Sequence, residues 1–345
     1  MRLLISGGGT GGHLSPALAV AQAFRAEEPD APILLVGRSG GLEERLVPAL
    51  GLELETIRVR GFNRDALWTN LALPALLPAA LARGLRIVDR FRPDVVLGVG
   101  GYVMMPSVAA ARLRQVPYVL QVSEADGLAN RLARPGAAAA CVTFAADVER
   151  FPTPRTLFTG QPLRPGFRRG RPRVPARSLL VVGGSQGALR LNEAVWQALP
   201  GLLEQFAEVV HLTGRQGEAE AAQHARPGYR PLAFSDDMPT LLAQADLVVG
   251  RAGVGTCAEL TAVGLPAVLV PGTFGGGHQE KNAELLVRSG AAVRLADSSL
   301  SGPTLLETVA SLSSERLARM AEASAKLGRP EAASDVIRVL REVAA

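Results

Sequence analysis

Three glycine-rich segments each follow a short apolar run and precede a helix-like stretch. They cover residues 7–13, 183–188 and 251–259. Glycines in such turns let the backbone approach a ligand, and the next helix directs its free amides and positive dipole end toward it. This placement favours an anionic ligand such as a nucleotide diphosphate. The alternative interpretation is that these segments are structural turns.

The first segment contains the best candidate for a catalytic base, His13. A helix N-terminus favours a neutral imidazole, which suits proton acceptance. The alternative is that His13 only positions a substrate by hydrogen bonding. The segment also fits the dinucleotide pattern G-x-G-x-x-G, but residues 36–39 lack the carboxylate that NAD binding requires. Arg38 suits a 2′-phosphate, so an NADP-dependent oxidoreductase stays as a weaker alternative.

The third segment places two polar side chains one helical turn apart. Thr256 can donate a hydroxyl hydrogen bond to a phosphate oxygen, and Glu259 can accept hydrogen bonds from both hydroxyls of a ribose. The alternative is a capping box in which Glu259 pairs with Thr256 at the start of a helix.

The elements that must position these segments alternate between strand and helix. Continuous apolar runs are typical of strands that are buried on both faces of a parallel sheet. Helix-like stretches cover residues 14–28, 103–114 and the tail from Ser313 onward. The predicted strands are residues 2–6, 33–36, 94–99, 117–121, 138–142, 178–182, 209–212, 247–249 and 267–270.

This alternation predicts an α/β protein of two Rossmann-like domains whose parallel sheets face a cleft. A stretch rich in Pro, Gly and Arg separates the two halves and is typical of a linker. The predicted organisation is an N-terminal acceptor domain (1–160), a linker (161–177), a C-terminal nucleotide-binding domain (178–328) and a final helix (329–345) that can return to the first domain.

Bulk composition narrows the function classes. The 345 residues, 48% of them hydrophobic, supply two cores. The net charge of +5 suits phosphate-bearing ligands or an anionic membrane, although Arg-rich codon usage explains it equally well. Only 4% of residues are aromatic, which disfavours nucleic-acid binding. Two separated cysteines indicate neither disulfide nor zinc, and no segment reads as a signal peptide or a membrane span.

Six motifs, in order along the chain, resemble those of the MurG family of glycosyltransferases. The ordered set extends over residues 5–283 and is far more specific than any one motif. The motifs are Gly8-Gly9-Thr10-Gly11-Gly12-His13, Gly100-Gly101-Tyr102-Val103 with Pro106, Gly160-Gln161-Pro162-Leu163-Arg164, the segment 183–188, the segment from Arg251 to Pro271, and His278-Gln279-Glu280-Lys281-Asn282-Ala283.

The resemblance implies the GT-B architecture and inverting transfer of N-acetylglucosamine from UDP-N-acetylglucosamine to the 4-hydroxyl of lipid I, which forms lipid II for the cell wall. No cofactor or metal is expected, and no Asp-x-Asp motif is present. By position, the resemblance assigns contacts with uracil to Phe234 and Ser235, contacts with the diphosphate to Arg164, Ser185 and Thr256, and the contact with ribose to Glu259. It assigns contacts with the sugar to Val254 and Gln279, and it places Thr10, Gly11 and Gly12 at the border of the sugar and the acceptor. Gly255, Cys257 and Ala258 complete the donor segment, residues 251–259.

The resemblance weakens on the acceptor side. Where the family carries His-Glu-Gln-Asn, this chain has Gln121-Val122-Ser123-Glu124-Ala125-Asp126. Glu124 or Asp126 is the expected substitute for the missing Asn, with Tyr102 as a further acceptor-side residue. A smaller departure is the run Gly275-Gly276-Gly277 before His278.

A lipid acceptor requires a membrane-facing surface, and the protein is expected at the cytoplasmic face of the membrane. The candidate surface is an apolar segment bordered in sequence by arginines, an arrangement that favours anionic lipid. The alternative is that these leucines are core. The apolar residues are Trp68, Leu71, Leu73, Leu76 and Leu77, and the arginines are Arg58, Arg60, Arg64, Arg83 and Arg86.

Three other functions compete with this assignment. One is a different GT-B enzyme or a UDP-sugar epimerase, and the second is the NADP-dependent oxidoreductase. The third is a nucleotide-sugar binding module without catalysis, which the altered stretch 121–126 leaves open.

Overall fold

The computed structural model describes residues 1–9, 11–61, 73–168, 170, 172–184, 187–272 and 277–345, without the side chains of 73–75. The chain divides into two compact units. Unit 1 is Met1–Pro165 together with Glu331–Ala345, and unit 2 is Gly166–Pro330. Each unit contains a parallel sheet with helices, which is the α/β class expected from the sequence.

The described strands of unit 1 form a seven-stranded parallel sheet in the order β3-β2-β1-β4-β5-β6-β7. Its order reverses direction between β1 and β4, which is the usual ligand-binding position of such sheets. The strands are β1 (Leu3–Ser6), β2 (Ile33–Arg38), β3 (Glu53–Ile57), β4 (Val95–Gly98), β5 (Tyr118–Val122), β6 (Ala139–Val142) and β7 (Thr156–Phe158).

Helices of unit 1 bury both faces of this sheet. Each face of the sheet carries one hydrophobic core. Both cores receive side chains from β1 and β4, because these strands are apolar at every position except one serine and one glycine. The helices are α1 (Gly11–Glu27), α2 (Glu43–Ala49), α3 (Leu73–Phe91), the short 3₁₀ turn η2 (Tyr102–Met104), α4 (Met105–Leu113), α5 (Leu128–Ala133), α6 (Asp147–Arg150) and α14 (Ala332–Ala344).

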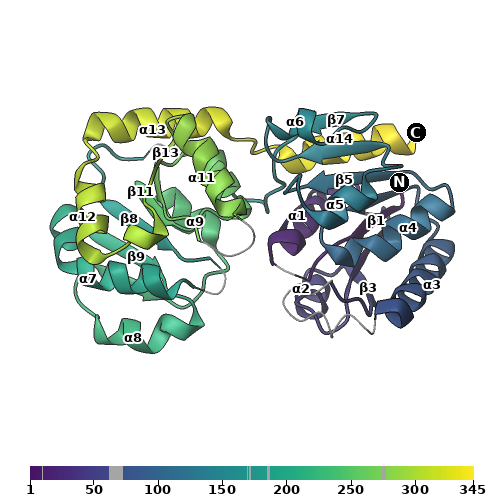
Figure 1. Cartoon of the computed structure of the whole chain (residues 1–345), viewed down its shortest axis with the longest axis horizontal. Helices are drawn as coiled ribbons and strands as arrows, with labels where there is room; N and C mark the ends of the chain where they lie inside the picture. The colour runs from purple at the N-terminus through teal and green to yellow at the C-terminus, as the bar shows by residue number, and fades with distance from the viewer. Residues whose placement is uncertain (10, 62–72, 169, 171, 185–186, 273–276) are drawn as a thin grey trace. The chain divides into compact units, whose positions relative to one another are not determined.

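The last helix, α14, belongs to unit 1 although 165 residues of unit 2 precede it. Figure 1 shows it in yellow among the elements of unit 1. Val336, Ile337 and Leu340 are fully buried in the same core as α1. The Arg341 guanidinium donates to Glu28 at 2.8 Å and forms an ion pair with Glu27.

Unit 2 repeats the plan with a six-stranded parallel sheet in the order β10-β9-β8-β11-β12-β13 among the described strands. The strands are β8 (Ser178–Val182), β9 (Glu208–Leu212), β10 (Tyr229–Leu232), β11 (Leu247–Gly250), β12 (Ala267–Leu269) and β13 (Ala292–Arg294). The helices are α7 (Leu189–Gln205), η3 (Arg215–Gly217), α8 (Glu218–Gln223), α9 (Met238–Gln244), α10 (Val254–Val263), α11 (His278–Arg288), η4 (Asp297–Ser299), α12 (Gly302–Ala310) and α13 (Ser314–Leu327).

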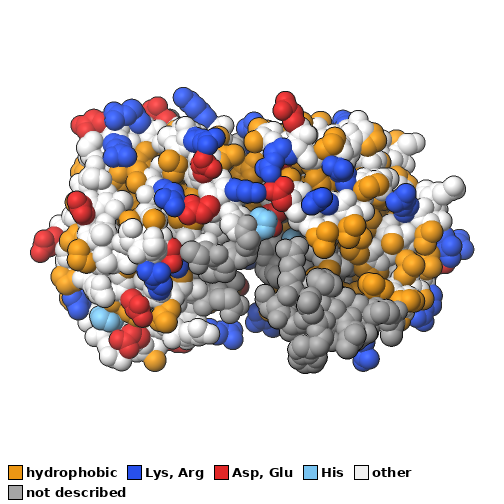
Figure 2. All heavy atoms as spheres, in the orientation of Figure 1, with side chains coloured by type: hydrophobic (Ala, Val, Ile, Leu, Met, Phe, Trp, Pro, Cys, Tyr) orange, Lys and Arg blue, Asp and Glu red, His pale blue; other side chains and the backbone are white. Residues whose placement is uncertain are grey.

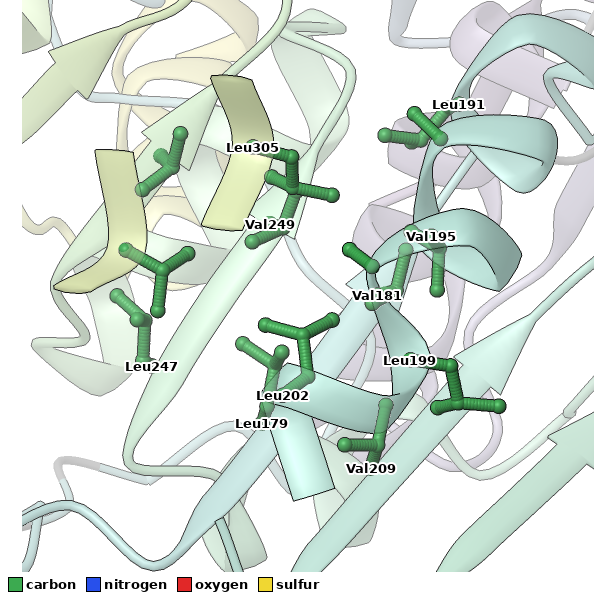
Figure 3. Close-up of a cluster of buried hydrophobic side chains, with 14 of the residues drawn as sticks. Leu179, Val181, Leu191, Val195, Leu199, Leu202, Val209, Leu247, Val249 and Leu305 are labelled. Carbon is green, nitrogen blue, oxygen red and sulfur yellow. The ribbon is translucent and has the colours of Figure 1, made fainter. Parts of the chain in front are cut away.

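The core of unit 2 lies between the sheet and the apolar face of α7. Figure 3 shows leucines and valines of β8, β11 and α7 meeting there. The stripe Leu191, Val195, Leu199 and Leu202 follows helical spacing and is fully buried.

The C-terminal tail differs from the sequence prediction. The tail was predicted to be helical throughout from Ser313, but α13 ends at Leu327 and α14 begins at Ala332. Pro330 lies in the break, where a continuous helix would lose a backbone hydrogen bond. The predicted linker 161–177 is divided between the units at Pro165 and Gly166, and Arg173, Arg177 and Ser178 donate backbone hydrogen bonds to the Asp246 carboxylate of unit 2.

None of the helices in the described part of the chain is long and apolar enough to cross a membrane.

Candidate functional site

The glycine-rich motifs follow the two central strands of each sheet. In unit 1 the loop 7–12 follows β1 and the Gly100-Gly101-Tyr102 motif follows β4. In unit 2 the segment 183–188 follows β8 and the segment 251–259 follows β11. Because parallel strands end at the same edge, each unit brings its two motifs together where the strand order reverses.

His13 is the third residue of α1 and lies against the loop that follows β4. A Cβ atom on Gly100 would lie 2.7 Å from His13 Cδ2, and one on Gly101 would lie 3.3 Å from His13 Nδ1. Both glycines also have positive φ values, 88° and 71°. The two glycines therefore provide the space in which the imidazole sits.

The surroundings of His13 favour its neutral form. Burial lowers the pKa of His13, and the negative charge of Glu124 offsets part of this effect by raising it. The sequence predicted a neutral ring from the helix N-terminus, whereas burial is the main physical cause in the structure. A neutral imidazole can accept a proton.

The altered acceptor-side stretch contributes Glu124 rather than Asp126 to the surroundings of His13. Asp126 is exposed and its carboxylate accepts two hydrogen bonds from Arg150, at 2.8 and 3.0 Å. Glu124 acts electrostatically on His13. Ser123 is buried, and its hydroxyl donates to Gln161 Oε1 at 2.9 Å.

Asn130 is a polar residue of this region that the sequence analysis did not identify. Its side chain is 4% exposed, and Nδ2 donates to the Glu124 carbonyl at 2.9 Å. In the described part of the chain its Oδ1 has no hydrogen-bond partner, and this atom would lie 3.7 Å from a Cβ on Gly100, the glycine that touches His13. Its only sequence signal is a short polar residue one turn into a helix that begins after Gly127.

Tyr102 packs beside the first glycine loop. Its hydroxyl accepts a hydrogen bond from Arg38 Nη1 at 3.3 Å and would lie 3.5 Å from a Cβ on Gly9. Gly11 and Gly12 are exposed in the first turn of α1, and Thr10 lies outside the described residues. The side chain of Arg38, which would suit a 2′-phosphate, is thus directed to Tyr102.

The second glycine loop packs tightly against the end of β9. Gly187 has a φ of 78°, and a Cβ there would overlap the Thr213 carbonyl oxygen. A Cβ on Gly183 would lie 2.8 Å from the Ala188 amide nitrogen. Only glycine fits these positions, and the loop leads directly into α7. Ser185 lies outside the described residues.

A buried hydrogen-bond network holds Thr213 in place. Asn192 Nδ2 donates to the Thr213 carbonyl at 2.8 Å, and Asn192 Oδ1 lies 3.1 Å from His211 Nε2. Trp196 Nε1 donates to the Tyr229 hydroxyl, which in turn lies 3.0 Å from His211 Nδ1. Because Asn192 Oδ1 can only accept, His211 Nε2 carries the proton and donates it to Asn192, and Nδ1 of the neutral ring accepts from the Tyr229 hydroxyl.

This network makes unit 2 sensitive to acid. Burial lowers the pKa of His211 to about 3 from an ordinary 6.5. Below pH 6.5 the unfolded chain binds this proton and the folded chain does not. The stability that depends on a neutral His211 is therefore fully present above pH 6.5 and is lost as the pH falls toward 3. One proton changes the free energy of unfolding by about 1.4 kcal/mol per pH unit. Between pH 7 and pH 5 the free energy of unfolding should therefore fall by about 2 kcal/mol less in the His211→Gln variant than in wild type.

Urea unfolding followed by Trp196 fluorescence measures this difference. A Trp68→Phe background leaves Trp196 as the only tryptophan, since the chain has two. Equal losses in the two proteins would show that His211 is not the titrating group.

The segment 251–259 presents uncapped amide groups at the start of α10. The N-cap residue is Gly253, which has no side chain for capping, and Thr256 is the third helical residue. The capping-box alternative for Thr256 and Glu259 is therefore wrong, because it requires Thr256 at the N-cap. Thr256 and Glu259 are both partly exposed.

The donor segment contributes backbone and side chains unequally. Val254, Gly255 and Ala258 are partly exposed. Cys257 is fully buried, and burial raises the pKa of its thiol to about 12, so it faces the core and only its backbone can serve a ligand.

Two polar side chains anchor the donor segment, and neither role was predicted. Arg251 is buried and donates to the Val270 carbonyl at 3.1 Å and to Asp297 at 2.6 Å; Arg190 of α7 pairs with the other oxygen of Asp297. Asn282 Nδ2 donates to the Ala252 carbonyl at 3.0 Å. These bonds connect the starts of α7, α10 and α11.

The side chain of Gln279 is oriented by a hydrogen bond with the backbone of Gly272. The Gly272 amide donates to Gln279 Oε1 at 2.8 Å, and the Nε2 group of the same side chain is a hydrogen-bond donor. Phe234 is 55% exposed, which leaves its ring face open for stacking, and Ser235 Oγ accepts a hydrogen bond from the Asp237 amide at 3.1 Å. Arg164 lies in unit 1, one residue before the division.

Comparison with known proteins places both units in one family. Residues 3–141 match the glycosyltransferase family 28 N-terminal domain, and residues 178–336 match the C-terminal domain. Curated proteins from Syntrophotalea carbinolica and Desulforudis audaxviator are each 40% identical over 99–100% of this chain and 99% of their own length. Both are named UDP-N-acetylglucosamine–N-acetylmuramyl-(pentapeptide) pyrophosphoryl-undecaprenol N-acetylglucosamine transferase.

Solved structures agree on the architecture. MurG from Acinetobacter baumannii is 28% identical and superimposes with a TM-score of 0.81 over 99% of each chain. The calicheamicin glycosyltransferase CalG4, at 21% identity and a TM-score of 0.72, shares the fold. The two parallel-sheet units are thus those of a GT-B glycosyltransferase.

Proposed function

The chain belongs to glycosyltransferase family 28, and from this premise we propose that it transfers N-acetylglucosamine from UDP-N-acetylglucosamine to the 4-hydroxyl of MurNAc in lipid I. The product is lipid II, the lipid-linked disaccharide for peptidoglycan synthesis. The observation that supports this most is full-length similarity to curated transferases with that name. The rival epimerase shares only the fold, at 13% identity.

We propose that unit 2 holds the donor. The uncapped start of α10 and the second glycine loop before α7 supply backbone amides for the diphosphate. Phe234 stacks on uracil, Glu259 accepts the ribose hydroxyls, and the Nε2 group of Gln279 donates to the sugar. Ser185, Thr256, Ser235 and Val254 complete this set, with Arg164 as an additional cation for the leaving group.

The reaction is an in-line displacement at the anomeric carbon. The acceptor oxygen forms a bond to C1 as the bond from C1 to the diphosphate oxygen breaks, and the configuration inverts. His13 takes the proton of the attacking hydroxyl, and Gly11 and Gly12 border the sugar. The negative charge that grows on UDP is stabilised by the amides of unit 2 and by Arg164.

A transfer assay tests the proposal. The full chain is incubated with a soluble lipid I analogue and either UDP-N-acetylglucosamine or UDP-glucose. We expect kcat/KM for the N-acetylated donor to be at least 100-fold higher, since the polar partners for the acetamido group are left unsatisfied by glucose. UDP release without a disaccharide product would contradict the proposal.

The membrane-facing surface is proposed to lie on α3, α4 and α5 of unit 1. Leu77, Leu113, Leu128 and Leu132 are 51–61% exposed, and Arg86, Arg112 and Arg131 are exposed on the same helices. Figure 2 shows hydrophobic and basic side chains gathered on this part of unit 1. Of the residues predicted for this surface, Leu76 is partly buried, and Trp68, Leu71, Arg64 and the Leu73 side chain lie outside the described part.

Vesicle flotation provides the corresponding prediction. The Leu77→Glu/Leu113→Glu variant should lose most binding to vesicles that contain anionic lipid, because two desolvated leucines become charged. Leu189→Glu is the matched control, since Leu189 is 67% exposed but lies in unit 2. Equal flotation of all three proteins would refute this surface.

A further inference from the structure

Glu43 is a buried carboxylate that no motif of the sequence identified. It begins α2, and the whole residue is 1% exposed. Burying a carboxylate is costly unless it is hydrogen bonded, so its position calls for a structural reason. Neighbouring Glu44 is exposed and is thus an ordinary surface residue.

The carboxylate of Glu43 reaches the first glycine loop. Its Oε1 accepts a hydrogen bond from the Gly9 amide at 2.6 Å and a weaker one from the Arg38 amide at 3.5 Å. The short first bond is typical of a charge-assisted contact. The second oxygen, Oε2, is buried and has no hydrogen-bond partner among the described residues.

Three glycines make room for this side chain. A Cβ on Gly8 would lie 2.8 Å from the carboxyl carbon of Glu43, one on Gly41 would lie 2.9 Å from it, and one on Gly37 would lie 2.8 Å from Cγ. Real Cβ contacts are not this short. Of the three, only Gly8 has a positive φ, so Gly37 and Gly41 are needed for space and not for backbone conformation.

The loop held by Glu43 also touches the other residues of the unit 1 site. Arg38, whose amide faces Glu43, donates through Nη1 to the Tyr102 hydroxyl. Gly8 lies on the other side against Gly101, since a Cβ on Gly101 would be 3.3 Å from the Gly8 carbonyl oxygen and 3.3 Å from His13 Nδ1. A shift of the loop would therefore displace His13 and Tyr102.

We propose that Glu43 is a positioning residue for catalysis: by hydrogen bonding the Gly9 amide it fixes the first glycine loop at the geometry that His13 and the acceptor require. This inference rests on the proposed function, because its kinetic effect is on transfer to the acceptor. It assigns to Glu43 no contact with substrate.

Kinetics of three substitutions test the role. Glu43→Ala removes the acceptor atom and Glu43→Asp withdraws it by one methylene, so both should lower kcat by about 10- to 100-fold, the effect of a catalytic group displaced by about an ångström. Glu43→Gln keeps an oxygen for the Gly9 amide and should stay within about 5-fold of wild type. The Kd for UDP should stay unchanged in all three, since the donor binds unit 2.

Two residues beside Glu43 provide a control variant, at Glu44, and a second way to displace the first glycine loop, at Gly41. Glu44→Ala removes an exposed carboxylate that accepts from the Gly40 amide at 3.0 Å and should leave kcat unchanged. Gly41→Ala introduces a Cβ that collides with Glu43 and should lower kcat like Glu43→Ala. In the double variant the two losses should not add, because the collision partner is already gone.

Hydrogen exchange separates this proposal from the assignment of the reaction. Amides in the peptide that contains Gly9 should exchange faster in Glu43→Ala than in Glu44→Ala, whether or not lipid I is the acceptor. Unchanged exchange and kcat in Glu43→Ala and Glu43→Asp would overturn the proposal. It would equally be overturned if Glu43→Gln lost as much activity as alanine, or if kcat fell only together with UDP affinity.

Discussion

Replacing His13 with alanine should lower kcat by about 10²- to 10⁴-fold, the usual contribution of a general base, and leave the Kd for UDP unchanged. The prediction rests on the proposed role of His13 as the base: the ring lies against Gly100 and Gly101, and burial lowers its pKa, which favours the neutral form. UDP binding should not respond because the residues proposed to bind UDP, apart from Arg164, belong to unit 2. Single-turnover transfer and UDP calorimetry measure the two quantities.

The pH profile distinguishes a base from a positioning role. A base must be neutral, so wild-type kcat should be level near pH 7.5 and fall as the pH drops through the lowered pKa of His13. The Glu124→Gln substitution removes a charge that raises this pKa and should move the acid limb to lower pH. His224→Ala serves as the control histidine in unit 2. An acid limb that does not move in Glu124→Gln would assign it to another group.

Replacing Glu259 with alanine should raise the Kd for UDP by about 10- to 100-fold, since hydrogen bonds to a charged group contribute roughly 1.5–3 kcal/mol. The side chain is partly exposed on α10, one turn beyond the uncapped amides proposed for the diphosphate. Glu284→Ala on α11 is a suitable control, because its exposed carboxylate pairs with Arg288.

A deoxy ligand tests the ribose contact itself. Wild type should bind 2′-deoxy-UDP or 3′-deoxy-UDP more weakly than UDP, and Glu259→Ala should bind all three alike. If the variant still discriminated against both deoxy ligands as strongly as wild type does, Glu259 would not be the ribose acceptor.

The interior of the fold could be predicted from sequence, but its edges could not. The nine predicted strands all exist, and their ends agree to within two residues, because buried parallel strands are continuous apolar runs. The four strands that were not predicted, β3, β7, β10 and β13, are the edge strands of the two sheets. Edge strands here are short or polar: β3 alternates with glutamates, and β10 contains Pro231.

The site was predictable only where backbone chemistry leaves a local signal. Glycine loops followed by helices identified the regions around His13, Gly187 and Thr256. Glu43 and Asn130 left no such signal, because their burial depends on segments about 30 residues away in sequence, as with Glu43 and Gly9 or Asn130 and Gly100. The main cause of the lowered His13 pKa could not be predicted for the same reason, since burial is a tertiary property.

The most direct test of the donor assignment is a crystal structure of the full chain with UDP. We predict that the uracil ring lies on Phe234, that both ribose hydroxyls donate to the Glu259 carboxylate, and that the diphosphate accepts from amides at the start of α10. Density for UDP against the loop 7–12 of unit 1, with the surface around Glu259 empty, would contradict the account.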